Sequence, residues 1–320
     1  MSANADSLFH DRSPLALRLV ADFTSILEAK DKSSVYPARL IWADDTGQHD
    51  ISVDLTLRGN FRLNHCEVPG LRIEFNDDVP GVFAGQNKLK LVTQCKRDSS
   101  MYQDYVIQEY DTYQAFELIT DYSFKSRLAR TTYEDTGEGQ ASWEEWSFVI
   151  EDWKALQQRL DLSAYKENRI NRDQLDPLTT AELSLFQYLI GNTDYSLLKG
   201  EGDEPCCHNV KVLIGETGLI PVPYDFDLAG VIDATYAAPP IGLGINEVTE
   251  RLYRGFCAHN AELAKSIEKF KSVKAGIYAA YENDEVRAKA RKKTTRFLDR
   301  FYKDIENEKR IDKKILKTCR

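Results

Sequence analysis

Hydrophobic and polar residues alternate along the first third of the chain. Ile51, Val53, Leu55 and Leu57 alternate with polar residues, directly after the turn-forming run at residues 44–47. The same period of two returns at residues 71–75 and 88–92. Alternation with turn residues between the segments is typical of half-buried strands joined as hairpins. We therefore expect an antiparallel sheet over residues 36–95, preceded by an extended segment and a short turn at residues 17–30.

The apolar spacing lengthens to that of a helix at residues 102–119 and returns to strands at residues 127–133 and 147–150. After residue 151 the pattern is helical, clearest at residues 152–159, 179–190 and 247–317. A short hairpin, residues 209–214 and 219–222, interrupts this half. We predict an α+β, two-lobed architecture, with a β-rich N-lobe at residues 1–151 and a mainly helical C-lobe at residues 152–320.

Composition narrows the class of protein. The chain has 320 residues, 42% of them hydrophobic and 29% charged. It contains no apolar run of the roughly 20 residues that a transmembrane helix needs, so we expect a soluble protein. The net charge of −9 argues against nucleic acid as a partner. The C-terminal stretch, residues 287–320, is nevertheless rich in Lys and Arg; it is either a solvated helix face or a patch for an anionic partner.

The six cysteines leave the compartment open. Cys66 and Cys95 flank the same predicted sheet and are the expected disulfide if the protein is exported. Cys206 and Cys207 are adjacent, and we expect them to stay reduced. Ala3, Asn4 and Ala5 match the end of a trimmed signal peptide, and chance explains three such residues nearly as well.

Carboxylate and amide side chains gather around the predicted hairpin. Asp194 follows the apolar helix, Asn209 begins the first hairpin strand, and Asp225 follows the second. A short turn brings Asn209 and Asp225 to the same end of the hairpin, where their oxygens form a site suited to Mg²⁺. Asp194 is placed to accept a proton from a hydroxyl or a water. No phosphate-binding P-loop, zinc-protease or serine-hydrolase motif occurs in the sequence.

The order Asp194, Asn209, Asp225 around a hairpin resembles the atypical kinases of the spore-coat CotH type, within the protein-kinase-like superfamily. The resemblance covers roughly residues 50–235 and implies a two-lobed protein-kinase-like fold. It implies an ATP-dependent phosphotransferase that uses Mg²⁺ or Mn²⁺, with nucleotide as one partner and an unknown phosphate acceptor as the other. By this resemblance Asp194 is the catalytic aspartate, and Asn209 and Asp225 bind the metal.

The same resemblance assigns nucleotide-binding residues in the N-terminal half. Arg58 lies in an Arg-Gly turn, and Lys90 occupies the strand whose lysine holds the phosphates, with Lys88 as the alternative. Glu109 of the following helix is assigned as the partner of Lys90, with Glu117 in reserve.

The sequence also departs from common protein kinases. Fifteen positions separate Asp194 from Asn209, no multi-glycine phosphate loop is present, and Asp227 stands where a glycine is usual. Two alternatives therefore stay open. One is an inactive binding or scaffold protein, in which these side chains are turn and surface residues. The other is a phosphohydrolase with Asp194, Asp225 and Asp227 as metal ligands.

Overall fold

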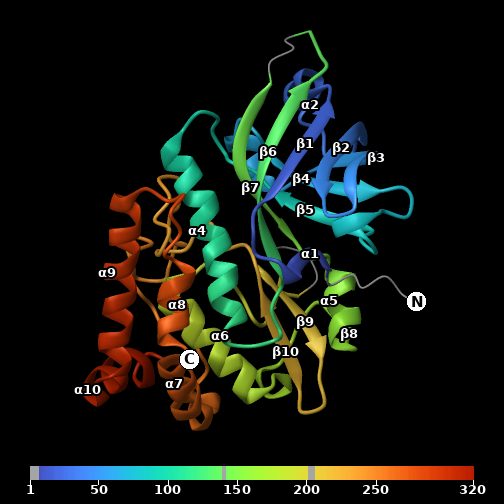
Figure 1. Cartoon of the computed structure of the whole chain (residues 1–320). Helices are drawn as coiled ribbons and strands as arrows, with labels where there is room; N and C mark the ends of the chain where they lie inside the picture. Colours follow the sequence, from blue (N-terminus) through green and yellow to red (C-terminus); the bar gives the residue numbers. More distant parts are fainter. Residues whose placement is uncertain (1–6, 139–141, 201–205) are drawn as a thin grey trace. The chain divides into compact units, whose positions relative to one another are not determined.

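The computed structural model describes residues 7–138, 142–200 and 206–320 (Figure 1). The chain divides into two compact units: Met1–Tyr110 with Lys125–Leu156, and Asp111–Phe124 with Gln157–Arg320. We call them the barrel unit and the helical unit and describe each by itself. The signal-like residues 3–5 lie outside the described part of the chain.

The barrel unit is built on seven strands that close on themselves in the order β1-β2-β3-β4-β5-β7-β6. Their bounds are β1 Leu15–Ala21, β2 Tyr36–Asp44, β3 Gly47–Arg58, β4 Gly70–Phe75, β5 Lys88–Val92, β6 Ser126–Asp135 and β7 Trp143–Ile150. Helix α1, Ser7–His10, precedes β1, and three short segments lie between strands: α2 Phe23–Ala29, α3 Asn60–His65 and the 3₁₀ turn η1 Gly81–Phe83. Helix α4, Ser100–Glu117, begins in this unit and ends in the other.

The predicted two-lobed protein-kinase-like fold is wrong. Strand β1 pairs antiparallel with β2 and parallel with β6, so the sheet closes into a mixed barrel instead of forming the expected lobe sheet. The sequence analysis missed β1 because it treated residues 17–30 as an extended segment and a turn. The antiparallel pairing expected within residues 36–95 is confirmed, since β2, β3, β4 and β5 pair in that way.

The barrel interior explains the alternation seen in the sequence. Leu55, Ile73 and Leu89 are direct neighbours across three successive strands, and each is fully buried. Burying one such side chain contributes roughly 1.5–3 kcal/mol. The intervening polar residues point out of the barrel, as a period of two requires.

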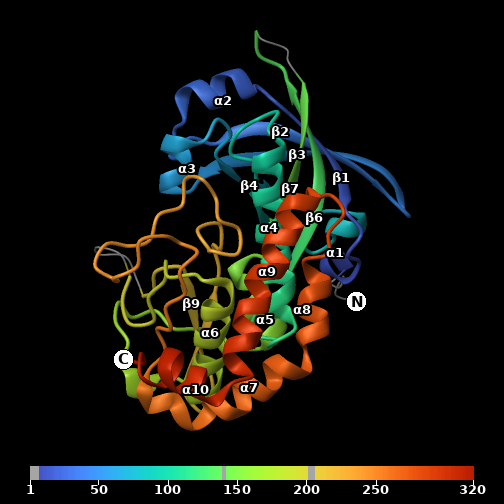
Figure 2. The ribbon, with the colours of Figure 1, turned by 90° about the vertical axis from the view of Figure 1, so that its left-hand side faces the viewer.

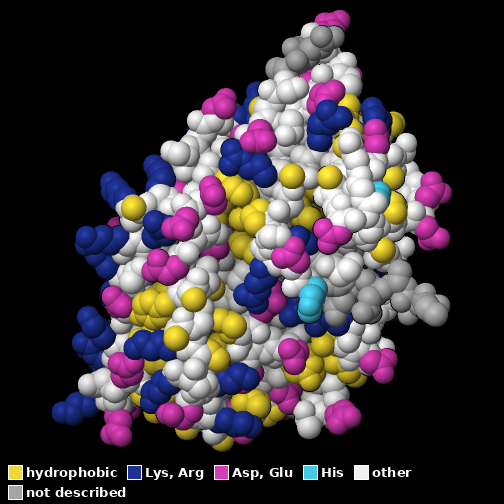
Figure 3. All heavy atoms as spheres, viewed as in Figure 1, with side chains coloured by type: hydrophobic (Ala, Val, Ile, Leu, Met, Phe, Trp, Pro, Cys, Tyr) yellow, Lys and Arg dark blue, Asp and Glu magenta, His cyan; other side chains and the backbone are white. Residues whose placement is uncertain are grey.

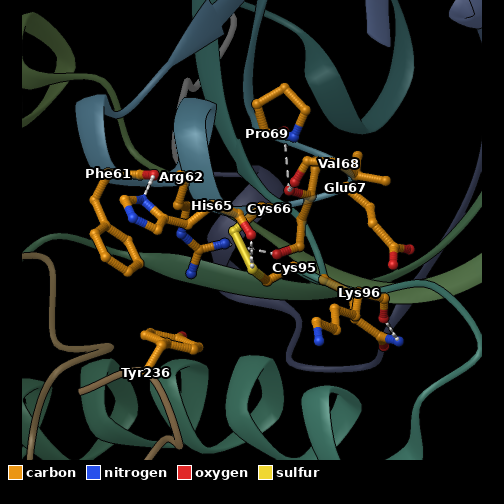
Figure 4. The surroundings of a disulfide bond; sticks show 12 residues. Phe61, Arg62, His65, Cys66, Glu67, Val68, Pro69, Cys95, Lys96 and Tyr236 are labelled. Atoms are coloured by element: carbon orange, nitrogen blue, oxygen red, sulfur yellow. Dashed lines mark hydrogen bonds between the residues drawn. A yellow bond between two sulfur atoms is a disulfide. The ribbon is translucent and has the colours of Figure 1, made fainter.

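A disulfide joins the end of α3 to the segment after β5 (Figure 4). Cys66 and Cys95 have Cα atoms 4.5 Å apart, within the range that the bond needs. The backbone N–H of Glu67 donates to the carbonyl of Cys95 at 2.8 Å, and the ring of His65 stacks on Phe61. The predicted pairing of Cys66 with Cys95 is confirmed.

The helical unit contains a three-stranded sheet and the remaining helices. Its strands are β8 Ser163–Ala164, β9 Val210–Ile214 and β10 Leu219–Pro223, in the order β10-β9-β8. Its helices are α6 Pro177–Ile190, α7 Leu263–Ser272, α8 Lys274–Ala280, α9 Ala288–Ile305 and α10 Glu308–Ile311. Its single-turn segments are η2 Arg172–Gln174, η3 Cys257–Glu262 and η4 Asp312–Leu316. Helix α5, Trp153–Leu160, runs from the barrel unit into this one.

Helix α6 is the centre of the helical unit, and it packs against α7 and α9 (Figure 2). The Asp176 side chain accepts from Thr179 N–H and caps its start, where Pro177 follows. Almost every later residue of α6 is buried, which is the mark of a helix enclosed on all sides.

The helix expected from residue 247 begins only at residue 263, after η3. Residues 247–256 are irregular because their arginines brace other backbone segments. Arg251 donates to the carbonyls of Tyr188, Leu189 and Phe297. The fixed positions of these carbonyls hold the segment out of a helix.

Two further disulfides occur in the helical unit. The structure bonds Cys206 to Cys207, so the expectation that both stay reduced is wrong. Cys257 is bonded to Cys319 across 62 residues, a pairing that the sequence analysis did not anticipate. None of the helices in the described ranges is long and apolar enough to cross a membrane.

Candidate functional site

The loop that carries Asp194 begins where α6 ends. Gly191 closes the helix at φ 66°, a left-handed conformation that favours glycine. A side chain there would also approach the Phe297 ring to 2.8 Å. The Asn192 side-chain oxygen then accepts from the backbone N–H of Asp194 at 2.9 Å. This turn fixes the direction in which Asp194 leaves the helix.

Arg254 braces the same loop on both sides of Asp194. Its guanidinium donates to the carbonyls of Thr193 and Tyr195 and lies over the Tyr195 ring, 4.9 Å from the ring centre. Burial lowers the pKa of Arg254, and the negative charge of Asp194 partly opposes that shift. The loop is therefore held by backbone contacts that do not use the Asp194 carboxylate.

The Asp194 carboxylate is held by two residues that precede β9. His208 Nε2 lies 2.9 Å from Asp194 Oδ1, and Asn209 Nδ2 donates to Oδ2 at 2.8 Å. Asn209 Nδ2 also lies 2.9 Å from the Asp194 carbonyl. Backbone bonds of His208 with Ser196 and Lys199 fix this strand start. The Asp194 side chain is thus in direct contact with the side chains of His208 and Asn209.

The β9–β10 hairpin brings Asn209 beside Asp225. Val210 is the register partner of Pro223, and the Tyr224 N–H donates to the Asn209 carbonyl at 3.0 Å. Asp225 follows immediately. The structure therefore places Asp194 and Asn209 in contact and Asp225 at the same hairpin end.

The backbone of Asp225 is fixed while its carboxylate is exposed. Its N–H donates to the Tyr113 hydroxyl at 2.9 Å. The next residue, Phe226, is fully buried against the rings of Tyr113 and Phe186. Asp227 is buried, and the Tyr236 hydroxyl lies 3.4 Å from its Oδ2.

Asn209 and Asp225 share an uncommon backbone conformation. Their φ values are 51° and 64°, in the left-handed region that non-glycine residues seldom adopt. Asn and Asp tolerate it better than other side chains do, because they bond locally to the backbone. Such conformations concentrate at functional sites.

Two oxygen groups at the hairpin end have no hydrogen-bond partner among the residues that the structure describes. The Asn209 Oδ1 and the Asp225 carboxylate accept no hydrogen bond from any residue within the described ranges. No group of three or more His, Cys, Asp or Glu side chains suited to an ion is present in that part of the chain. Any ion here would have two protein ligands and take the rest from solvent or a ligand.

The nucleotide-binding residues expected in the N-terminal half belong to the barrel unit. Leu89 and Leu91 of β5 are buried in the barrel core, so Lys88 and Lys90 share the outer face. Arg58 ends β3 and pairs with Gly70 of β4, directly before the left-handed Gly59.

Glu109 is buried and lies 3.3 Å from the guanidinium of Arg62. Arg62 also donates to the Thr93 carbonyl at 2.7 Å. The sequence analysis paired Glu109 with Lys90 and did not consider this arginine. The reserve residue, Glu117, accepts from the side chain of Gln114 at 3.2 Å.

Sequence reasoning assigned no role to His208 or Arg254. His208 stands next to Asn209, but a lone histidine without a motif carries no specific signal. Arg254 is 60 positions from Asp194, so only the folded chain shows that it braces this loop.

No protein-family model matches the chain, and no curated protein matches it either.

Proposed function

We propose that the chain is a phosphotransferase that uses ATP with Mg²⁺ or Mn²⁺, with Asp194, Asn209 and Asp225 as its centre. One observation supports this most strongly. The same hairpin end offers oxygen atoms of Asn209 and Asp225 that accept no hydrogen bond from a described residue, beside the Asp194 carboxylate held by His208. The proposal concerns the chemistry of this centre and does not require the fold that was expected.

The residues fit a hard divalent ion. Mg²⁺ takes few ligands from the protein and fills the remainder with water and substrate phosphates. Asn209 Oδ1 and the Asp225 carboxylate would hold it, and it would neutralise charge on the phosphate oxygens. Hydrogen bonds of the Asn209 carbonyl and the Asp225 N–H fix the backbone from which both side chains extend.

Asp194 suits the role of proton acceptor. Its two oxygens face His208 and Asn209, and each keeps a second lone pair for an acceptor hydroxyl. Because both neighbours fix its orientation, little reorganisation is needed before proton transfer. Lys90, Glu109 and Arg58 stay predictions for nucleotide binding that rest on the resemblance to CotH-type kinases.

The experiment compares nucleotide binding and turnover in three variants. Asp225→Asn keeps a side chain that tolerates the left-handed backbone, and it should weaken Mg²⁺-dependent ATP binding at least about tenfold. Asp194→Asn should leave ATP affinity within about twofold and lower turnover by about a hundredfold or more. Asp161→Asn is the matched control, because Asp161 is an exposed aspartate of the same unit with φ 53°.

Calorimetry with ATP and each ion measures binding, and release of labelled phosphate to water or to candidate hydroxyl acceptors measures turnover. A parent protein that binds no ATP with Mg²⁺ or Mn²⁺ would contradict the proposal and favour a scaffold. Hydrolysis of a simple phosphate ester without nucleotide would favour the phosphohydrolase.

A further inference from the structure

A hollow lies in the helical unit, and none of its lining residues belongs to the Asp194 centre. It encloses about 300 Å³ between residues 249–253, the second half of α9 and the C-terminal segment. Four positive side chains, Arg251, Arg300, Lys313 and Lys314, line it together with one carboxylate, Asp304, so three positive charges are in excess. We call it the basic pocket. Such a surplus is unusual in a chain whose net charge is −9.

Asp304, the single carboxylate of the pocket, already accepts hydrogen bonds from neighbouring side chains. Asp304 is buried and accepts from Lys314 at 2.8 Å, from Arg310 at 3.1 Å and from the Tyr188 hydroxyl at 3.0 Å. Burial acts to raise the pKa of Asp304, but these hydrogen bonds outweigh it and lower the pKa. Asp304 therefore forms ion pairs with Lys314 and Arg310 and, within the described residues, with none of the other cations that line the pocket.

Arg251 is the half-buried cation of the basic pocket. Its Nε and Nη2 donate to backbone carbonyls, and its guanidinium lies 3.7 Å from the centre of the Phe297 ring. Burial, and then the positive charge of Arg300, lower the pKa of Arg251 to about 9. No carboxylate within the described part of the chain forms an ion pair with Arg251, Arg300 or Lys313.

The positive side chains of the basic pocket would be stabilised by a bound anion. Two guanidinium groups near one another repel, and removal from water strengthens that repulsion. A phosphate group relieves it, because arginine binds its oxygens through paired, charge-assisted hydrogen bonds. Figure 3 shows several Lys and Arg side chains, with Asp and Glu among them, along the side where Figure 1 draws α9 and α10.

We infer that the basic pocket binds the phosphate group of a small molecule. Its volume is at the lower end for small-ligand sites, which suits a compact anion. Three excess charges match a phosphate or pyrophosphate better than a single carboxylate. The pocket shares no lining residue with the Asp194 centre, so this inference is independent of the proposed phosphotransferase.

The test is calorimetric titration of the full chain with pyrophosphate and with inorganic phosphate. A chelator removes divalent ions, and added NaCl keeps the ionic strength constant. Arg300→Gln combined with Lys313→Gln should weaken pyrophosphate binding at least about tenfold. Arg251 is left unchanged, because its backbone contacts hold the loop.

The matched control replaces Arg296 and Lys309 by Gln. Both are exposed cations of α9 and α10 that do not line the pocket, and their loss should change the affinity less than about twofold. Three results would overturn the inference: no heat with pyrophosphate up to about 10 mM, equal affinity in the pocket variant, or tighter binding of citrate than of pyrophosphate. Unchanged binding in Asp225→Asn would show that the signal does not come from the Asp194 centre.

Discussion

Replacing Glu145 by Gln should change how the stability of the barrel unit depends on pH. Glu145 lies on β7, its side chain is 6% exposed, and neither carboxylate oxygen has a hydrogen-bond partner in the described ranges. Its cross-strand neighbour Thr131 lies 2.6 Å from the Ser147 hydroxyl and leaves Glu145 without that donor. Burial, and then the negative charge of Asp98, raise the pKa of Glu145 to about 7, and the nearby N–H groups of Asp98 and Trp143 oppose this rise only in part.

The sign and size follow from proton linkage. The folded state holds this proton up to about pH 7, whereas the unfolded chain loses it near the ordinary value of 4.5. The stabilisation is therefore complete below the unfolded value and is lost as the pH rises through the folded one. Each unit of pKa difference corresponds to about 1.4 kcal/mol, so the free energy of unfolding should fall by about 2.5 kcal/mol between pH 5 and pH 8 from this group alone.

Urea unfolding at several pH values measures this fall. All four tryptophans belong to the barrel unit, so their fluorescence reports on it. Glu145→Gln should remove the pH-dependent loss, whereas Glu144→Gln, at an exposed neighbour paired with Arg130, should retain it. An equal pH dependence in the parent and in Glu145→Gln would refute the reasoning.

Two further substitutions test the contacts that hold each unit together. Cys66→Ser removes the bond to Cys95, which closes 29 residues, and should lower the urea-measured free energy of unfolding of the barrel unit by about 3–4 kcal/mol; free thiols at both positions in the parent would count against it. Asp304→Asn leaves Lys314 without its carboxylate and should cost about 3 kcal/mol in thermal unfolding, against little change for Asp312→Asn at an exposed pair. Since the pKa of Asp304 is lowered, the parent should lose this contribution as the pH falls below about 4, and a pH-independent difference between parent and variant would contradict the assignment.

The elements that the sequence predicted well depend on local pattern. Strands β3, β4 and β5 show apolar alternation next to turn residues, and the turn of the β9–β10 hairpin spans only four positions. Asn209 could be placed beside Asp225 for the same reason, since a short turn fixes the register.

Closure of the barrel could not be predicted from the local alternation of apolar residues. It depends on the parallel pairing of Leu15 with Ala129, residues separated by more than a hundred positions. Nothing in the apolar alternation of either strand specifies its partner. The pairing of Cys257 with Cys319 and the ion pair of Arg62 with Glu109 are likewise contacts between distant residues.

The closed barrel does not alter the residues of the proposed Asp194 centre. Phosphoryl transfer asks the protein mainly to position groups and neutralise charge. Under the proposal those tasks would fall to the Asp194 loop, the Arg254 contacts and the hairpin end, all within the helical unit. Since function is carried by such local sites and not by fold class, a barrel in the other unit neither supplies nor removes this centre. Asp225→Asn and Asp194→Asn therefore test the proposal directly, because one variant removes a metal ligand and the other a proton acceptor on an otherwise unchanged backbone.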